Sequence, residues 1–428
     1  MRNEQIRYTP EYVPTQKTEL RRISSKIAKA FFLYLILIIF LDALSEFNVV
    51  FSIILAGSMV FSGLFWLISQ KYPKICVYSF VVLSSVFCSF AILHKISDTF
   101  AVIPSILVHI CLIFLVYMSI KFKKPLLLMV CFLEFSIISC EIVGLNYEKS
   151  TKGIANADAI SFYTLHNLAE IAASVLPFLF ILSKKDALLK LDISRVLCFE
   201  KVKRKKLFSL VMVGLFICFF ANQVSNVLLQ NLSLLGITCK LPNLPEVNKD
   251  PVRIVLYLIM ISVSPALVEE FVFRGVILGS LRKFGNFFAI ISSSILFGVV
   301  HSNAVQIPFA FVVGLILGMI LVETNSMLPG ILIHFLNNLF SCLDSIISEY
   351  NEEISQEFMT FRWMTVLILS IFAFRYILSI RPTLFEFDRN SHALFSTKKS
   401  MKIFFLSKGM IVVLLIFFLF TLSTVSLA

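Results

Sequence analysis

Charged side chains are scarce in this chain. Of its 428 residues, 15% are charged and 58% are hydrophobic, and the mean hydropathy is +0.90. A soluble globular domain is roughly half apolar and a quarter charged, so this composition excludes that class. The sequence predicts an all-α protein, a polytopic bundle of transmembrane helices.

Patterned cysteines and the zinc-peptidase motif HExxH are both absent. Seven of the nine cysteines fall within long apolar runs, and the other two, Cys198 and Cys239, are isolated from each other. This distribution predicts neither a disulfide framework nor paired metal ligands. We therefore expect no metal and no cofactor. A zinc-dependent membrane metallopeptidase remains a less favoured alternative, because it would use Glu and His in a similar way.

Apolar runs, by contrast, are long and numerous. Runs of about 17 to 25 residues match the thickness of a bilayer, and they predict about 13 spans. These spans are residues 28–44, 48–69, 75–93, 100–120, 126–145, 160–182, 207–229, 252–268, 287–301, 304–322, 327–347, 360–379 and 409–427. The first run is long enough to span, so we expect a retained anchor rather than a cleaved signal. Gly314 and Gly318 form a small-xxx-small pair that predicts close helix packing.

Lysine and arginine are concentrated in alternate loops. If the basic N-terminal tail is cytoplasmic, the predicted inside segments hold 29 of the 38 Lys and Arg residues, and the outside segments hold 5. This asymmetry follows the positive-inside rule. The net charge of +12 therefore reflects membrane orientation, and no nucleic-acid partner is expected. We expect an integral protein of a prokaryotic cell membrane, with the bilayer around it and its N-terminus in the cytoplasm.

The chain divides at a basic segment that contains KVKRKK. The predicted regions are a cytoplasmic basic tail (1–27), a six-span membrane region of unknown role (28–182), a basic cytoplasmic linker (183–206), a core (207–347) and a two-span C-terminal region (348–428). Juxtamembrane basic runs also suit contact with anionic lipid headgroups, which is a secondary interpretation of the linker.

Three ionisable residues lie together in the stretch ALVEEFVFRG, residues 266–275. On a helix, Glu270 and Arg274 are four residues apart with the acid first, the favourable order for an ion pair. Glu269 has Phe273 in the corresponding position and is left without a charged helical partner. A carboxyl with little solvent suits general acid or base chemistry, and ionisable residues in a membrane are candidates for function. The competing interpretation places both glutamates at a helix end in the headgroup layer.

Two of the six histidines, His301 and His334, lie on nearby predicted spans. FGVVH places His301 one helical turn after Phe297, and HFLNN places His334 one turn before Asn338, on the same helix face. A lone histidine in a membrane is more often a hydrogen-bonding partner between helices. A carboxylate and an imidazole together, however, activate water, and a second imidazole and an amide stabilise a developing oxyanion. The set predicts hydrolysis of an amide bond without a covalent nucleophile.

EEFVFRG, FGVVH and HFLNN resemble the EExxxR, FxxxH and HxxxN signature of the CAAX-processing and bacteriocin-processing membrane peptidases, the CPBP, Abi or type II CAAX endopeptidase family. The resemblance covers roughly residues 250–345. It implies a metal-independent intramembrane glutamate endopeptidase. Its substrates would be membrane-associated peptides or lipoproteins, either CAAX-type prenylated or of the signal or bacteriocin type.

The resemblance also implies a role for each matched residue. Glu269 would be the base that activates water, with the assistance of His301. His334 and Asn338 would form the oxyanion site. Helix geometry alone does not exclude the neighbouring Asn337, and the family motif favours Asn338.

Glu270 and Arg274 are implied as a supporting ion pair, in agreement with their spacing. The depths of the predicted residues conflict, however. With a rise of about 1.5 Å per residue, Glu269 falls near the inside end of span 252–268, whereas His301 falls near the outside end of the next. We therefore expect tilted helices, or a segment around 276–288 that dips back into the bilayer.

The alternative from another class is a non-catalytic membrane protein of the same fold. Such a protein would use the polar set for an immunity, scaffold or transport role. It would keep the helical bundle and the ion pair but would not turn over a peptide.

Overall fold

The computed structural model describes most of the C-terminal half of the chain and parts of the N-terminal half. The described residues are 12–47, 163–178 without 165, 172 and 176, 198–239, 250–380 and 395–427. Within them every element is helical except one short two-stranded ribbon, which confirms the all-α class. The four predicted spans between residues 48 and 145 lie outside the described residues, so the count of 13 stays a prediction.

The chain separates into two compact units. One comprises residues 1–34, 177–245 and 258–428, and the other comprises residues 35–176 and 246–257. The predicted boundaries at 27, 182, 206 and 347 are expectations that these units do not test.

The smaller unit is described at its helical margins. It includes the later part of α1 (Tyr12–Phe47) and most of α9 (Pro251–Leu258). Asn167 donates from Nδ2 to the carbonyl oxygens of Tyr163 and Leu256, at 2.9 and 3.2 Å. The Tyr163 and Tyr257 rings meet edge to face, with centroids 5.7 Å apart. These contacts join the helical stretch around Tyr163 to α9.

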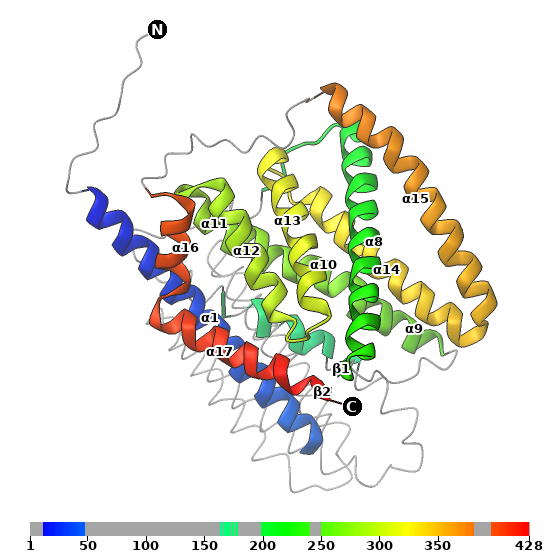
Figure 1. Ribbon diagram of the computed structural model, residues 1–428, viewed down its shortest axis with the longest axis horizontal. Helices are drawn as coiled ribbons and strands as arrows, with labels where there is room; N and C mark the ends of the chain where they lie inside the picture. The colour runs from blue at the N-terminus through cyan, green and yellow to red at the C-terminus, as the bar shows by residue number, and fades with distance from the viewer. Residues whose placement is uncertain are drawn as a thin grey trace, which may run out of the picture. The chain divides into compact units, whose positions relative to one another are not determined.

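The larger unit contains the remaining helices (Figure 1). They are α8 (Arg204–Leu234), η4 (Ile259–Val263), α10 (Ser264–Glu269), η5 (Glu270–Leu278), α11 (Gly279–Leu281), η6 (Arg282–Phe284), α12 (Asn286–Val300), α13 (Gln306–Thr324), α14 (Leu328–Tyr350), α15 (Glu352–Ile380), α16 (Thr397–Phe405) and α17 (Lys408–Ser423). Among the described residues, five helical stretches are long and apolar enough to cross a membrane, or six if the bent pair α16 and α17 counts as one span.

One uninterrupted helical stretch, Pro251–Phe284, carries the first sequence motif. It runs from α9 through η4, α10, η5 and α11 to η6, where η4 and η5 are π-helical. The predicted span 252–268 therefore ends too early. Of the charges that suggested a helix end, Glu270 and Arg274 are buried inside the bundle, where they neutralise each other, and Glu269 is partly exposed. Arg274 was counted among the 29 basic residues of the predicted inside segments. It lies within the bundle, however, and does not belong to an inside loop.

The chain reverses after this stretch at Gly285, whose φ of 121° is a conformation that favours glycine. The next helix, α12, begins at Asn286 and ends at Val300. The segment around 276–288 is therefore helical up to Phe284 and does not form a separate dipping loop. Glu269 lies 16 residues before the reversal at Gly285 and His301 lies 16 residues after it, so the two residues return to a similar level along the two helices.

Small residues allow α12 and α13, and also α8 and α14, to approach each other closely. A Cβ added to Gly314 of α13 would lie 3.0 Å from Ser294 of α12, and one added to Gly318 would lie 3.2 Å from Ile290. This confirms the packing predicted for the small-xxx-small pair. Gly214 of α8 makes a similar close approach, where a Cβ would lie 2.5 Å from Ile333 of α14.

Segments that were predicted to share one side of the membrane meet at one end of the larger unit. Phe199 pairs with Ser326 in an isolated β-bridge. Lys206 Nζ lies 3.2 Å from Glu323 Oε1, and Arg282 donates to Asn325 Oδ1 at 3.1 Å. All of these residues come from segments predicted to lie inside.

At the other end of α8, strand β1 (Ile237–Cys239) pairs antiparallel with strand β2 (Val425–Leu427). The predicted span 409–427 is therefore too long, because its helix ends at Ser423 and the chain turns into the ribbon. β1 follows the predicted span 207–229 and β2 forms the end of the predicted span 409–427, and both positions were predicted to lie outside.

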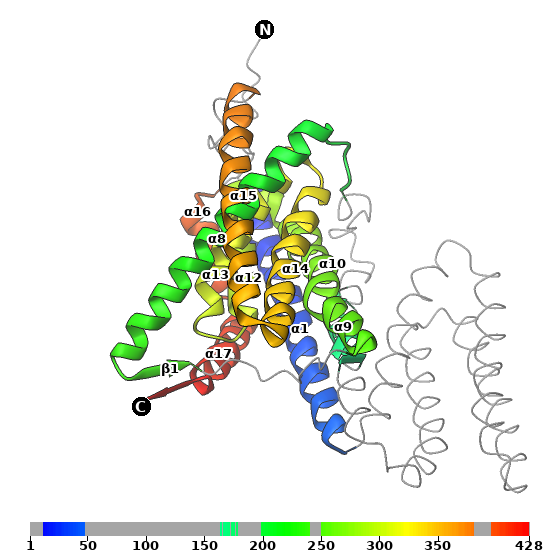
Figure 2. The same ribbon diagram turned by 90° about the vertical axis from the view of Figure 1, so that its right-hand side faces the viewer.

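Helix α15 turns back from the end of α14 and packs against both α14 and α8 (Figure 2). The predicted outside segment 348–359 is mostly helical, since α15 already begins at Glu352. Asn351 Oδ1 accepts the backbone N–H groups of Glu353 and Ile354 at 2.9 and 3.2 Å. This cap, together with acidic residues in the first turn, stabilises the start of α15.

Candidate active site

The two adjacent glutamates begin the site, at the junction of α10 and η5. Glu270 Oε1 lies 3.2 Å from Arg274 Nη1, and the two side chains are 1% and 2% exposed. Arg274 also lies over the Phe297 ring, 4.2 Å from its centroid. The guanidinium is therefore held by charge and by a cation–π contact in a buried position. The predicted ion pair is present in the structure.

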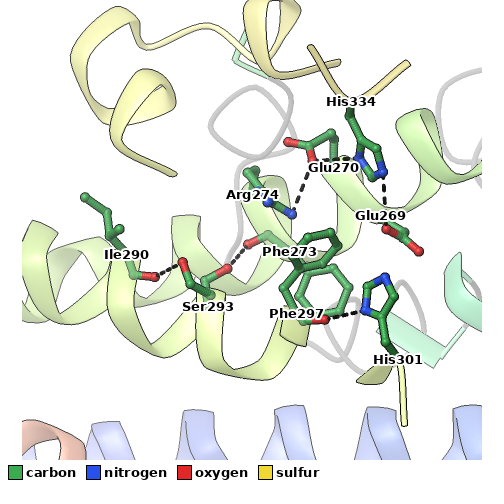
Figure 3. A network of polar contacts seen from close by, with 10 residues as sticks. Glu269, Glu270, Phe273, Arg274, Ile290, Ser293, Phe297, His301 and His334 are labelled. Atoms are coloured by element: carbon green, nitrogen blue, oxygen red, sulfur yellow. Dashed lines mark hydrogen bonds and ion pairs between the residues drawn. The ribbon is translucent and has the colours of Figure 1, made fainter. Parts of the chain in front are cut away.

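His334 of α14 reaches both glutamates (Figure 3). Its Nδ1 lies 3.2 Å from Glu270 Oε1, and its Nε2 lies 3.7 Å from Glu269 Oε2. Because a carboxylate only accepts hydrogen bonds, an ionised Glu270 fixes Nδ1 as a donor. The expectation that Glu269 is left without a charged partner holds along its own helix. Its partner comes from another helix, which helical spacing does not reveal.

The glutamates differ in how far they are buried. The Glu269 side chain is 22% exposed, whereas that of Glu270 is 1% exposed. Glu270 is thus enclosed by Arg274 and His334, and Glu269 retains access to its surroundings.

Gly330 makes room for the buried glutamate. It lies one turn before His334 on α14, and a Cβ at this position would be 3.1 Å from Glu270 Oε2. The missing side chain lets the carboxylate approach α14 and reach His334. Sequence reasoning did not identify Gly330, although its spacing of four residues from His334 was the available signal.

His301 lies at the end of α12 with its ring against Phe297. Its Nδ1 is 2.8 Å from the Phe297 carbonyl oxygen, and the two rings are edge to face at 5.1 Å. A carbonyl oxygen can only accept, so Nδ1 carries the proton and Nε2 carries the lone pair of the neutral ring. Figure 3 draws the Glu269 carboxylate between the rings of His334 and His301.

Phe297 is the common neighbour of these groups. Its ring centroid lies 5.9 Å from that of His334 and 5.1 Å from that of Phe273, in addition to the contacts with His301 and Arg274. The sequence motif contains Phe297, but its position against both histidines and the arginine follows only from helix packing.

Asn338 lies one turn beyond His334 on α14 and binds a different part of the Pro251–Phe284 stretch. Its Nδ2 donates to the carbonyl oxygen of Ile261 in η4 at 3.0 Å. The neighbouring Asn337 donates to Asn338 Oδ1 at 3.1 Å. The structure therefore brings Glu269, Glu270, Arg274 and His334 into one network, joins His301 to it through Phe297, and places Asn338 alongside. Within the residues that the structure describes, no three His, Cys, Asp or Glu side chains are grouped so that they could hold a metal ion.

The fold and this polar set define the class: a polytopic membrane protein whose helical core carries carboxylate, imidazole and amide groups suited to hydrolysis. Residues 251–340 match the family described as type II CAAX prenyl endopeptidase Rce1-like. The match covers 90 of the 428 residues and includes all three motifs, which confirms the resemblance. The description of this family names an endopeptidase. No curated protein and no solved structure matches the chain.

Proposed function

We propose that the protein is an intramembrane endopeptidase that hydrolyses membrane-associated peptides with a water molecule activated by Glu269 and His301. The observation that carries this proposal is the unequal treatment of two adjacent glutamates. Glu270 is enclosed by Arg274 and His334, whereas Glu269 is 22% exposed and its Oε2 lies 3.7 Å from the Nε2 of His334. Glu269 is therefore the carboxylate that is available to a substrate.

Charge balance supports a state of Glu269 and His334 that is ready for catalysis. Arg274 compensates the charge of Glu270. A further carboxylate without a compensating charge is costly in an apolar bundle. The network is neutral when Glu269 and His334 hold one proton between them. With that proton on His334, Glu269 is a free carboxylate and can act as a base.

The reaction follows from these protonation states. Glu269 removes a proton from water, and the lone pair on His301 Nε2 holds the same water by accepting its second hydrogen. The water oxygen then bonds to the scissile carbonyl carbon, whose π electrons move to the carbonyl oxygen. The proton held by Glu269 passes to the amide nitrogen as the C–N bond breaks, which releases an amine and a carboxylic acid.

His334 and Asn338 are assigned to the developing oxyanion. The Nε2–H of protonated His334 and the second N–H of the Asn338 amide are donors on one face of α14, one turn apart. Donors held in place before the reaction stabilise charge in a site with little water. Glu270 and Arg274 keep the His334 ring in the orientation that this role requires.

The matched family supports prenylated peptides as the substrate class, since its description names a prenyl endopeptidase. Farnesylated CAAX peptides are therefore the first substrates to test, and signal-type or bacteriocin-type membrane peptides are the second. A membrane-embedded site with a partly exposed carboxylate suits a substrate that is delivered from the bilayer.

The test is a comparison of membranes that contain the native protein with membranes that contain Glu269→Gln. Peptides whose termini appear only with the native protein identify substrates, and Glu357→Gln, which changes an exposed glutamate of α15, is the matched control. Cleavage that persists in Glu269→Gln would reject the glutamate mechanism. Cleavage that a chelator abolishes would favour a zinc peptidase, and no cleavage of any membrane peptide would favour a non-catalytic role.

The orientation is a second part of the proposal. The predicted distribution of basic residues, 29 in inside segments and 5 in outside segments, supports a cytoplasmic Lys203 and an outside Glu352. With introduced cysteines, an impermeant thiol reagent added from the outer face is expected to modify Glu352→Cys and to leave Lys203→Cys unmodified. The reverse labelling pattern would invert the topology.

A further inference from the structure

The helical stretch that carries Glu269 has a break in its hydrogen bonding eight residues earlier. In a regular α-helix the carbonyl of Ile261 would accept the N–H of residue 265. Residue 265 is proline, which has no N–H. The break coincides with the π-helical turn η4 (Ile259–Val263), and α10 begins directly after it at Ser264.

A side chain from α14 supplies a donor at this break. Asn338 Nδ2 donates to the Ile261 carbonyl oxygen at 3.0 Å, and the carbonyl can only accept, so the amide nitrogen must face it. Asn337 Nδ2 donates in turn to Asn338 Oδ1 at 3.1 Å, which fixes the orientation of that amide. The two asparagines therefore form a relay that ends on the backbone of η4.

The second π-helical segment of the same stretch is fastened in a comparable way. Ser293 of α12 donates from Oγ to the carbonyl oxygen of Phe273 in η5 at 2.7 Å. Each π-helical segment thus receives a side-chain donor from a neighbouring helix. In membrane helices, carbonyls freed by Pro or by local π geometry are satisfied by such partners because lipid offers none.

We propose that the Asn338 carboxamide replaces the backbone donor that Pro265 lacks, and that Asn337 is a positioning residue that acts through Asn338. Together they fix the break in the Pro251–Phe284 stretch and hold α10, with Glu269 at its end, against His334. α14 would then hold this stretch at two points, through Asn338 at Ile261 and through His334 at the glutamates.

A double-mutant cycle between Asn338 and Pro265 tests the proposal by thermal unfolding in detergent. Asn338→Ala is expected to lower Tm by about 2 to 4 °C, because a carbonyl in the bundle loses its donor. Pro265→Ala restores a backbone N–H, so in that background the same substitution is expected to lower Tm by less than half as much. Equal losses in both backgrounds would overturn the proposal.

The control and the backup variant keep the cycle decisive. Asn231→Ala removes an exposed amide that donates only within its own helix, to the Val227 carbonyl, and is expected to leave Tm unchanged. If Pro265→Ala does not fold, Pro265→Ser restores the same N–H. These measurements need no substrate, so they can fail or succeed independently of the proposed function.

The positioning role of Asn337 is tested by kinetics, and this part rests on the proposed function. Asn337→Ala is expected to lower kcat by less than roughly 10²-fold, the effect of a displacement below 1 Å, with KM unchanged. Asn337→Gln retains the amide donor and should recover part of kcat. In an Asn338→Ala background, Asn337→Ala should lower Tm no further. Additive Tm losses, or a change in KM alone, would overturn the relay.

Discussion

The described part of the larger unit contains a buried guanidinium–carboxylate pair, Arg274 with Glu270, and a partly buried one, Arg362 with Asp344, and the two serve different purposes. Arg274 and Glu270 belong to one helix and lie 3.2 Å apart, whereas Arg362 of α15 and Asp344 of α14 join two helices at 2.6 Å. Both arginines also lie against aromatic rings, at 4.2 Å from Phe297 and 4.9 Å from Phe219. The chemistry of the two pairs is thus nearly the same.

Their surroundings differ. Arg362 also donates to the Phe340 carbonyl at 3.1 Å, so its pair is a fastening between α14 and α15. Glu270, in contrast, shares its carboxylate with His334, which in turn approaches Glu269. The Arg274–Glu270 pair belongs to the candidate active site because it orients His334 beside a second carboxylate, that of Glu269. The predictions below separate the two cases.

The largest effect is expected at the carboxyl outside both pairs. Glu269→Gln should lower turnover by at least about 10²- to 10⁴-fold, as for loss of a general base. Since Glu269 is not half of a buried pair, Tm in detergent should be unchanged or slightly raised. Peptide cleavage and thermal unfolding on the same preparation check this, with Glu357→Gln as the control. A fully active Glu269→Gln protein would end the assignment.

Breaking the pair within the site is expected to affect stability most. Arg274→Ala leaves a buried carboxylate without its counterion and should lower the free energy of unfolding by ~3 to 5 kcal/mol. Glu270→Gln removes the orphaned charge and should partly rescue it. Chemical denaturation of the two single variants and the double variant measures the coupling. If the losses simply add, the two residues are not coupled.

Breaking the fastening pair should affect stability alone. Arg362→Ala is expected to lower the free energy of unfolding by about 1.5 to 3 kcal/mol, the range for hydrogen bonds to charged groups. At a temperature where the variant is folded, kcat should equal that of the native protein, because the pair is not part of the site. A kcat that falls while the unfolding free energy is preserved would contradict this division.

The smallest effect is expected at the glycine that makes room for Glu270. Gly330→Ala places a methyl group 3.1 Å from Glu270 Oε2 and should displace the carboxylate by a few tenths of an ångström. We expect a loss in kcat below the roughly 10²-fold that a 1 Å displacement can cause. Gly409→Ala creates an equally close 3.1 Å contact with Ala28 of α1, outside the site, and is the matched control. Identical kinetics for the two variants would show that the glycine has no role in positioning.

Sequence reasoning predicted the elements well where a helix begins or ends at a polar segment. The spans 207–229, 304–322 and 327–347 fall within or close to α8, α13 and α14, because the length of an apolar run is a local property of the sequence. It placed a helix end wrongly near Glu269, because charges in a sequence resemble a boundary until their partners are known. It also missed the ribbon between β1 and β2, whose strands are nearly 190 residues apart along the chain.

The candidate site divides in the same way. The sequence by itself determined the membrane class, the three motifs and the Glu270–Arg274 pair, because composition, residue order and a spacing of four residues are fixed along the chain. Only the tertiary structure decided that His334 joins both glutamates and that Gly330 makes room for Glu270. It also decided that Asn338 donates to the Ile261 carbonyl, four residues before Pro265. Those contacts depend on how α14 packs against the Pro251–Phe284 stretch, and helix packing is set by side chains from both partners together.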